Sequence, residues 1–250
     1  MRKLFEGIKN KEGSGFSLIE SLITMSLFLL VVLATMEFYT FTRGKFQKVE
    51  EEQEASQAAY AALDKMKTDL AESGLGILIP VELGVLDAIS ESNGTLIILS
   101  REKQLMLSSD LVPGQTRINL ASTSKIRKGR ELCFFTSTKA EIKSVSLVDR
   151  NSIVLSSPID FSYSKEGCSV IMIKRVSLFF DESRQTLRRK VNRSSAQPLL
   201  EETAFFGFDY NKASNLLKLS ISLKTNKEKK YEISVFPENV ALASALKAGK

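Results

Sequence analysis

The first seventy residues carry two hydrophobic patterns in succession. Residues 1–15 are polar and basic, and residues 16–36 then contain a single charged side chain, that of Glu20. This apolar run has no glycine or proline, so it predicts an uninterrupted helix. Its 21 residues would extend roughly 30 Å, the thickness of a bilayer core. We therefore predict a transmembrane helix over residues 16–42.

Beyond this run, small and apolar side chains recur at steps of three and four, as on one face of a helix. They are Ala55, Ala59, Ala62, Leu63, Met66 and Leu70. Charged residues, Asp69 among them, supply the polar cover, and Gly74 is a stop signal. An amphipathic continuation over residues 43–73 should pack its apolar face on a folded domain.

Residues 74–250 carry short apolar runs separated by turn residues, a pattern typical of strands. The clearest alternation of apolar and polar positions covers residues 217–223 and predicts a hairpin with a returning strand at 231–235. Further strands are predicted at residues 95–99, 104–107, 117–120, 131–136, 142–148, 153–155, 169–180, 186–191 and 204–210. The predicted fold is α+β: a long N-terminal helix, transmembrane and then amphipathic, packed on a β-rich head at 74–250.

Composition narrows the range of functions. The net charge of +6 over 250 residues is small, which argues against a nucleic-acid partner. The densest basic stretch admits DNA contact, but a solvated hairpin explains it more simply. It consists of Arg184, Arg188, Arg189, Lys190 and Arg193.

The chain has no histidine, which excludes Ser-His-Asp and Cys-His catalysis and every metal site that uses histidine. No paired carboxylates mark an acid–base set. We therefore predict no enzyme, no cofactor and no metal. The two cysteines, Cys133 and Cys168, form either one disulfide in an oxidising compartment or two buried free thiols.

The polar leader differs from an ordinary secretory signal. It ends in Gly15 directly before the apolar run, and no A-x-A-like cleavage site follows. Basic residues ahead of the span favour a cytoplasmic leader and an exported C-terminal side, although Arg43 and Lys45 act weakly in the opposite direction. The sequence predicts a single-pass protein of the cytoplasmic membrane whose head lies outside the cytoplasm.

Glu20 places a carboxylate inside the apolar run, which is costly in a membrane and therefore suggests a function. Cleavage after Gly15 would free an α-amino group on Phe16, and opposite charges attract strongly in an apolar medium. If the Glu20 carboxylate paired with the Phe16 amine of a neighbouring subunit, this pair would set the axial offset between the two subunits. Alternatively, Glu20 has no role in assembly and lies at the level of the lipid headgroups.

The segment GFSLIE at residues 15–20 resembles the cleavage and methylation motif of type IV prepilins, with Ser17 where threonine is more usual. The resemblance implies that a prepilin peptidase removes residues 1–15 after Gly15 and methylates Phe16, and that Glu20 sets subunit register. Residues 63–74, 176–181, 187–189, 197–199 and 206–210 are similar, less specifically, to PilW-type minor pilins and J-type pseudopilins.

This resemblance implies a PilW-like minor pilin that packs into a type IV pilus and helps to initiate assembly or cap the tip. Its partners would be the prepilin peptidase, the inner membrane and other pilin or pseudopilin subunits, met through the N-terminal helix. One alternative is a J-type minor pseudopilin of a type II secretion system. Another, from a different class, is a membrane-tethered adhesin or binding module.

Overall fold

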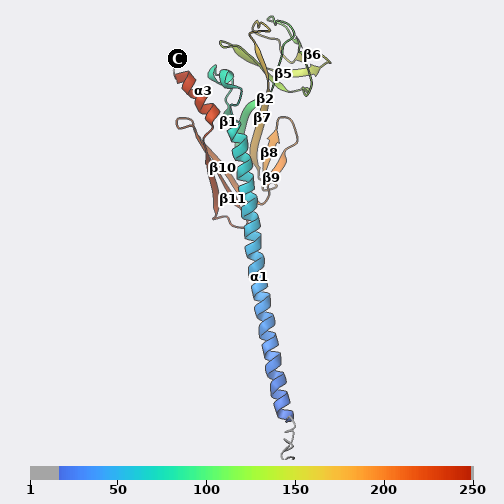
Figure 1. Ribbon diagram of the computed structural model, residues 1–250, viewed down its shortest axis with the longest axis vertical. Helices are drawn as coiled ribbons and strands as arrows, with labels where there is room; N and C mark the ends of the chain where they lie inside the picture. The colour runs from blue at the N-terminus through green and yellow to red at the C-terminus, as the bar shows by residue number, and fades with distance from the viewer. Residues whose placement is uncertain (1–16, 249–250) are drawn as a thin grey trace, which may run out of the picture. The chain divides into compact units, whose positions relative to one another are not determined.

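The computed structural model describes residues 17–248 (Figure 1). The chain divides into two compact units, Met1–Gln53 and Glu54–Lys250. Helix α1, Leu18–Ala71, begins in the first unit and ends in the second. The general α+β layout, a long apolar N-terminal helix and a β-rich C-terminal domain, is confirmed.

The second unit holds twelve strands and two further helices among the described residues. In chain order these are α2 (Leu78–Glu82), β1 (Ile89–Ser92), β2 (Thr95–Leu105), β3 (Arg117–Asn119), β4 (Glu131–Phe135), β5 (Ala140–Val148), β6 (Ser152–Leu155), β7 (Ser169–Asp181), β8 (Thr186–Val191), β9 (Gln197–Leu200), β10 (Thr203–Asn211), β11 (Leu216–Leu223), β12 (Lys230–Val235) and α3 (Glu238–Ala248).

Strand β7 organises the larger sheet, whose order is β1-β2-β7-β4-β5-β6-β3, with β8 paired to β7 and β9 paired to β8. One edge of β7 pairs with β2. Its other edge pairs with β4 over residues 169–172 and with β8 over residues 176–181. Residues 173–175 lie between these two partners, and we call this gap the sheet fork.

The first hydrophobic core joins both sheets to the end of α1. It contains Leu63 and Met66 of α1, Leu96 of β2, and Leu217 and Leu219 from the small sheet β10-β11-β12. Figure 1 shows this end of the helix between β10–β11 on one side and β8–β9 on the other. The spacing of three and four that the sequence displays is therefore the spacing of a buried helix face.

A second core lies under β3 to β6 and includes Phe134 and Tyr163. Successive residues of a strand point to opposite faces of the sheet. Cys133 and Ile171 accordingly belong to the first core, while Phe134 and Val170 belong to the second. Strands β4 and β7 thus contribute to both cores.

Several bounds differ from the sequence prediction. The runs predicted at 95–99 and 104–107 are joined into one strand, β2, which ends at Leu105. Arg101 and Lys103 interrupt the apolar pattern, but both stay paired with β7 on either side of a bulge. The sequence prediction did not include α2, β1, β9 or α3. The predicted hairpin is confirmed as β11 and β12.

Candidate functional site

The first candidate site is the part of α1 that lies in the first unit. Seven consecutive apolar residues, Leu27 to Leu33, are all exposed, which covers every side of the helix. A helix on the surface of a soluble protein would instead carry one apolar stripe, turned inward. This segment is long and apolar enough to cross a membrane, and none of it is buried. The structure is therefore compatible with a single-pass membrane protein.

Hydroxyl groups in this segment donate to the helix's own backbone. Ser26 Oγ donates to Leu22 O at 2.8 Å, Thr35 Oγ1 donates to Val31 O at 2.7 Å, and Thr24 Oγ1 donates to Glu20 O. Lipid offers no hydrogen-bond partner, so polar groups there must be satisfied within the protein. These three hydroxyls meet that requirement.

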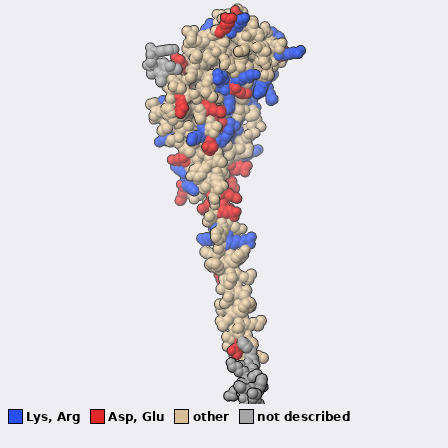
Figure 2. Space-filling view, viewed as in Figure 1, with Lys and Arg blue, Asp and Glu red and all other residues tan. Residues whose placement is uncertain are grey.

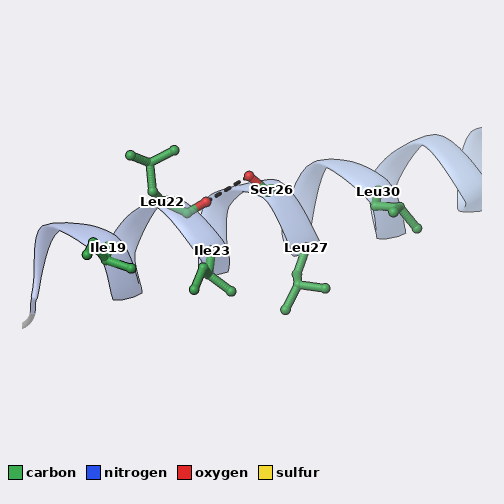
Figure 3. A pocket seen from close by; sticks show the side chains of 6 residues that line it. All are labelled: Ile19, Leu22, Ile23, Ser26, Leu27 and Leu30. Carbon is green, nitrogen blue, oxygen red and sulfur yellow. Dashed lines mark hydrogen bonds between the residues drawn. The ribbon is translucent and has the colours of Figure 1, made fainter.

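One face of the segment is shallowly hollowed, and Figure 3 shows its side chains with the Ser26–Leu22 hydrogen bond. Its lining is Ile19, Leu22, Ile23, Ser26, Leu27 and Leu30. Ridges of side chains from one helix pack into such grooves on another. The face therefore has the shape and polarity to pack against an apolar helix or lipid chains.

Glu20 lies in the first turn of α1 and is exposed. Within residues 17–248 its carboxylate has no hydrogen bond or ion pair. The positive end of the helix dipole favours a negative charge here. Gly15 and Phe16 lie outside the described residues, so cleavage after Gly15, methylation of Phe16 and pairing with Glu20 stay predictions.

Charged side chains mark the end of the apolar segment. Arg43, Lys45 and Lys48 follow it, and four glutamates succeed them at 50–52 and 54. Figure 2 shows the tan apolar section, then a blue group and then a red group along the helix. Long basic side chains at the end of a span can lay their stems on apolar surface and extend their charge to water.

The other end of α1 carries a buried ion pair. Arg189 of β8 donates from Nε to Asp69 Oδ2 at 2.6 Å and from Nη2 to Asp69 Oδ1 at 2.7 Å. The Asp69 side chain is 2% exposed. The sequence prediction that Asp69 belongs to the polar cover is therefore wrong, because β8 lies over this turn of the helix and excludes water.

The basic stretch at 184–193 does not form one surface. Arg188 pairs with Asp181, with Nε 2.8 Å from Oδ2, while Arg189 pairs with Asp69. Because they are consecutive in a strand, these two arginines point to opposite faces of the sheet. Internal ion pairs therefore account for two of its five basic residues.

Both cysteines are free thiols in the structure, so the disulfide that the sequence left open is not formed. Strand register gives the reason: Cys133 lies opposite Ile171 in the first core, whereas Cys168 packs against the second core. Burial raises the pKa of Cys133 to about 12 and that of Cys168 to about 11. Both thiols are therefore protonated at neutral pH and are poor nucleophiles.

A group of three charged side chains in the head joins β5 to the segment that follows β6. Lys143 Nζ is 3.0 Å from Glu141 Oε2 and 2.6 Å from Asp160 Oδ2. Glu141 also accepts hydrogen bonds from the backbone N–H groups of Asp160 and Phe161, at 3.0 and 3.2 Å. These contacts engage both oxygens of Glu141 and fasten residues 160–161 to β5, which is a structural role.

No protein family and no curated protein matches this chain. Two solved structures show a local likeness. The tailspike of Acinetobacter baumannii bacteriophage AP22, in complex with A. baumannii capsular saccharide, is 19% identical with a TM-score of 0.28. The tailspike of Pseudomonas phage phi297 is 14% identical with a TM-score of 0.26. These alignments cover 31% and 30% of this chain but only 15% and 14% of the tailspikes, and they support no assignment.

Proposed function

We propose that the chain is a type IV prepilin-like protein, a minor pilin of the PilW type. One observation carries the proposal: α1 begins with an exposed segment that is apolar on every side and bears one carboxylate, Glu20, in its first turn. The prepilin-like motif at residues 15–20 overlaps the start of this helix. Such a helix needs lipid or other helices around it.

The exposed apolar segment of α1 would be covered first in the membrane and later in the fibre. In the membrane, lipid chains cover the apolar side chains while the head stays outside the cytoplasm. In a fibre, the same surface packs against the helices of neighbouring subunits, because close packing between apolar helices can replace contact with lipid. The mature chain moves from the first environment to the second as the pilus is initiated or capped.

Glu20 would supply the register for this transfer. Cleavage after Gly15 makes Glu20 the fifth residue of the mature chain and leaves a positive amine on Phe16. A carboxylate in an apolar medium is costly until an opposite charge neutralises it. Packing that brings the amine of one subunit to the Glu20 carboxylate of another removes that cost only at a particular axial offset.

The first test is the mass and N-terminal sequence of the full chain, extracted from membranes with and without a prepilin peptidase. We expect a mature chain that begins at N-methylated Phe16 when the peptidase is present. The variant Gly15→Ala should keep residues 1–15, while Gly13→Ala, a control in the same leader, should be processed normally. A chain that remains uncut with the peptidase, or is cut after Met36, contradicts the proposal.

A second test separates processing from assembly. The variant Glu20→Gln should be cleaved normally, yet its recovery in sheared fibres should fall at least tenfold. Glu37→Gln changes another carboxylate on the same helix, beyond the apolar run, and should leave recovery unchanged. Equal recovery of Glu20→Gln and the unaltered chain would remove the role in register.

A further inference from the structure

At the sheet fork, no strand pairs with residues 173–175 on one edge of β7. Asn192 and Arg130 supply hydrogen bonds to the β7 backbone there instead. Asn192, just after β8, donates its N–H to Arg175 O at 2.7 Å and accepts from Arg175 N–H through Oδ1 at 2.9 Å. Arg130, just before β4, donates from Nη2 to Ile173 O at 3.0 Å. Buried backbone groups need partners, and these contacts supply them. Arginines from separate segments are thereby drawn together.

A cavity of about 150 Å³ opens at this place. Three guanidinium-bearing residues line it, Arg130, Arg175 and Arg193, together with Glu131 and Asn192. Pockets for small organic ligands usually measure roughly 300–1,000 Å³. The cavity therefore has room for one small polar group and not for a whole nucleotide or sugar.

The charges around the cavity do not cancel. Arg130 pairs with Glu102, and Arg175 pairs with Glu131, with Nη2 2.9 Å from Oε2. Arg193 has no ion pair among the described residues. Three positive and two negative charges leave one positive charge. Each guanidinium carries five N–H donors, so donors remain free after the existing pairs are counted.

Gly129 leaves room for the third guanidinium close to the backbone. A Cβ at this position would lie 2.0 Å from Arg193 Nη1 and 2.3 Å from its Cζ, so any larger residue would displace the group. Gly129 also has φ of +81°, a conformation that glycine adopts without strain. The close approach of Arg193 to the backbone at position 129 thus depends on glycine.

We propose that the sheet fork is a binding site for one phosphate group. A carboxylate has two oxygens in one plane and matches a single guanidinium fork. A tetrahedral phosphate presents oxygens in several directions, which suits donors that come from the segment before β4, from β7 and from the segment after β8. The residues of the site all belong to the second unit, and the proposal does not depend on the proposed function.

Thermal unfolding of the full chain in detergent tests the site, with inorganic phosphate replacing chloride at constant ionic strength. Bound ligand stabilises the folded state, so Tm should rise with the logarithm of 1 + [phosphate]/Kd, by about 3 °C at ten times the Kd. Arg193→Gln and Gly129→Ala should each weaken the fitted affinity at least tenfold. Glycerol 3-phosphate in a parallel titration distinguishes a phosphate ester from the free ion, and a logarithmic rise of Tm with either supports the site.

Two matched variants control for charge and for strain. Arg184→Gln removes an exposed arginine from the β7–β8 turn, and Gly114→Ala adds a Cβ at φ of +85° where nothing lies within 4 Å. Both should keep the affinity for phosphate. An equal loss of affinity in Arg184→Gln, a Tm that rises linearly and not logarithmically with phosphate concentration, or acetate binding as tightly as phosphate would overturn the proposal. None of these outcomes bears on cleavage after Gly15.

Discussion

Two carboxylates of helix α1, Glu20 near its start and Asp69 near its end, have different surroundings. Asp69 is 2% exposed and is bound at both oxygens by Arg189. Glu20 is exposed among apolar side chains and has no ion pair within the described residues. The apolar residues differ in the same way: those near Asp69 are buried in the head, and those near Glu20 are exposed. The head therefore covers the apolar side chains at one end of the helix, and the described residues leave those at the other end uncovered.

The largest expected effect separates the two carboxylates. Asp69→Asn leaves the Arg189 guanidinium buried without its counter-charge, so we expect the free energy of unfolding of the head to fall by about 3–5 kcal/mol. Glu20→Gln should change it by less than about 0.5 kcal/mol. Urea unfolding of the detergent-solubilised full chain, followed by tyrosine fluorescence, measures both.

A double variant checks the reason for this loss. Replacing both partners, Asp69→Leu with Arg189→Met, removes the unpaired charge, so stability should return to within about 2 kcal/mol of the original. A double variant as unstable as Asp69→Asn would mean that the geometry of the pair, and not the uncompensated charge, holds this turn of the helix.

The next effect compares two leucines. Leu63 is 1% exposed in the first core, and Leu63→Ala should cost about 2–4 kcal/mol through lost burial and the cavity left behind. Leu30 is 64% exposed, and Leu30→Ala should leave the stability of the head unchanged. The same urea titration applies. Similar losses for the two variants would contradict the division of the helix into a buried end and an exposed end.

A smaller effect compares two tyrosine hydroxyls. Tyr231 Oη lies 2.8 Å from Ser56 Oγ, a hydrogen bond between β12 and α1 in the second unit. Tyr231→Phe removes that bond and should cost about 1 kcal/mol. Tyr39→Phe, on the exposed part of the helix, should cost nothing measurable in head stability. A loss in Tyr39→Phe would show that the two regions are energetically coupled.

The smallest effect concerns acid. Hydrogen bonds from the Ser183 hydroxyl and the Arg188 guanidinium hold the pKa of Asp181 below its ordinary value. A carboxyl group with a lowered folded-state pKa contributes its stability above an unfolded pKa of about 4, and that contribution is lost as the pH falls further. Asp181→Asn should therefore lower the urea midpoint slightly at pH 7 and less at pH 3. If Asp181→Asn lowers the urea midpoint equally at pH 7 and at pH 3, Asp181 does not contribute to the pH dependence of stability.

The elements that the sequence predicted well are those whose signals are local. The apolar run, the spacing of three and four up to Leu70, and Gly74 with its φ of +75° define α1 within two residues of its described end. The strict alternation over 217–223 defined a hairpin because both strands and their turn are contiguous. These patterns report the environment of each residue directly.

The remaining features depend on contacts between distant residues. Asp69 and Arg189 are 120 residues apart, so no local pattern identified either one as the other's partner. Cys133 lies in β4 and Cys168 directly precedes β7, which pairs with β4, but the register that sends their side chains to different cores cannot be read from their spacing. The arginines of the sheet fork likewise come from three segments that only the sheet topology brings together.

Strand β7 has a consequence for how the head folds. Val170 and Met172 belong to one core, Ile171 and Ile173 belong to the other, and the four residues are consecutive. If either core loses its packing, one face of β7 loses its cover. Regions that open together form a cooperative unit, and a shared strand enlarges that unit. The two cores should therefore fold and unfold as one, without a stable state in which half of the head is formed.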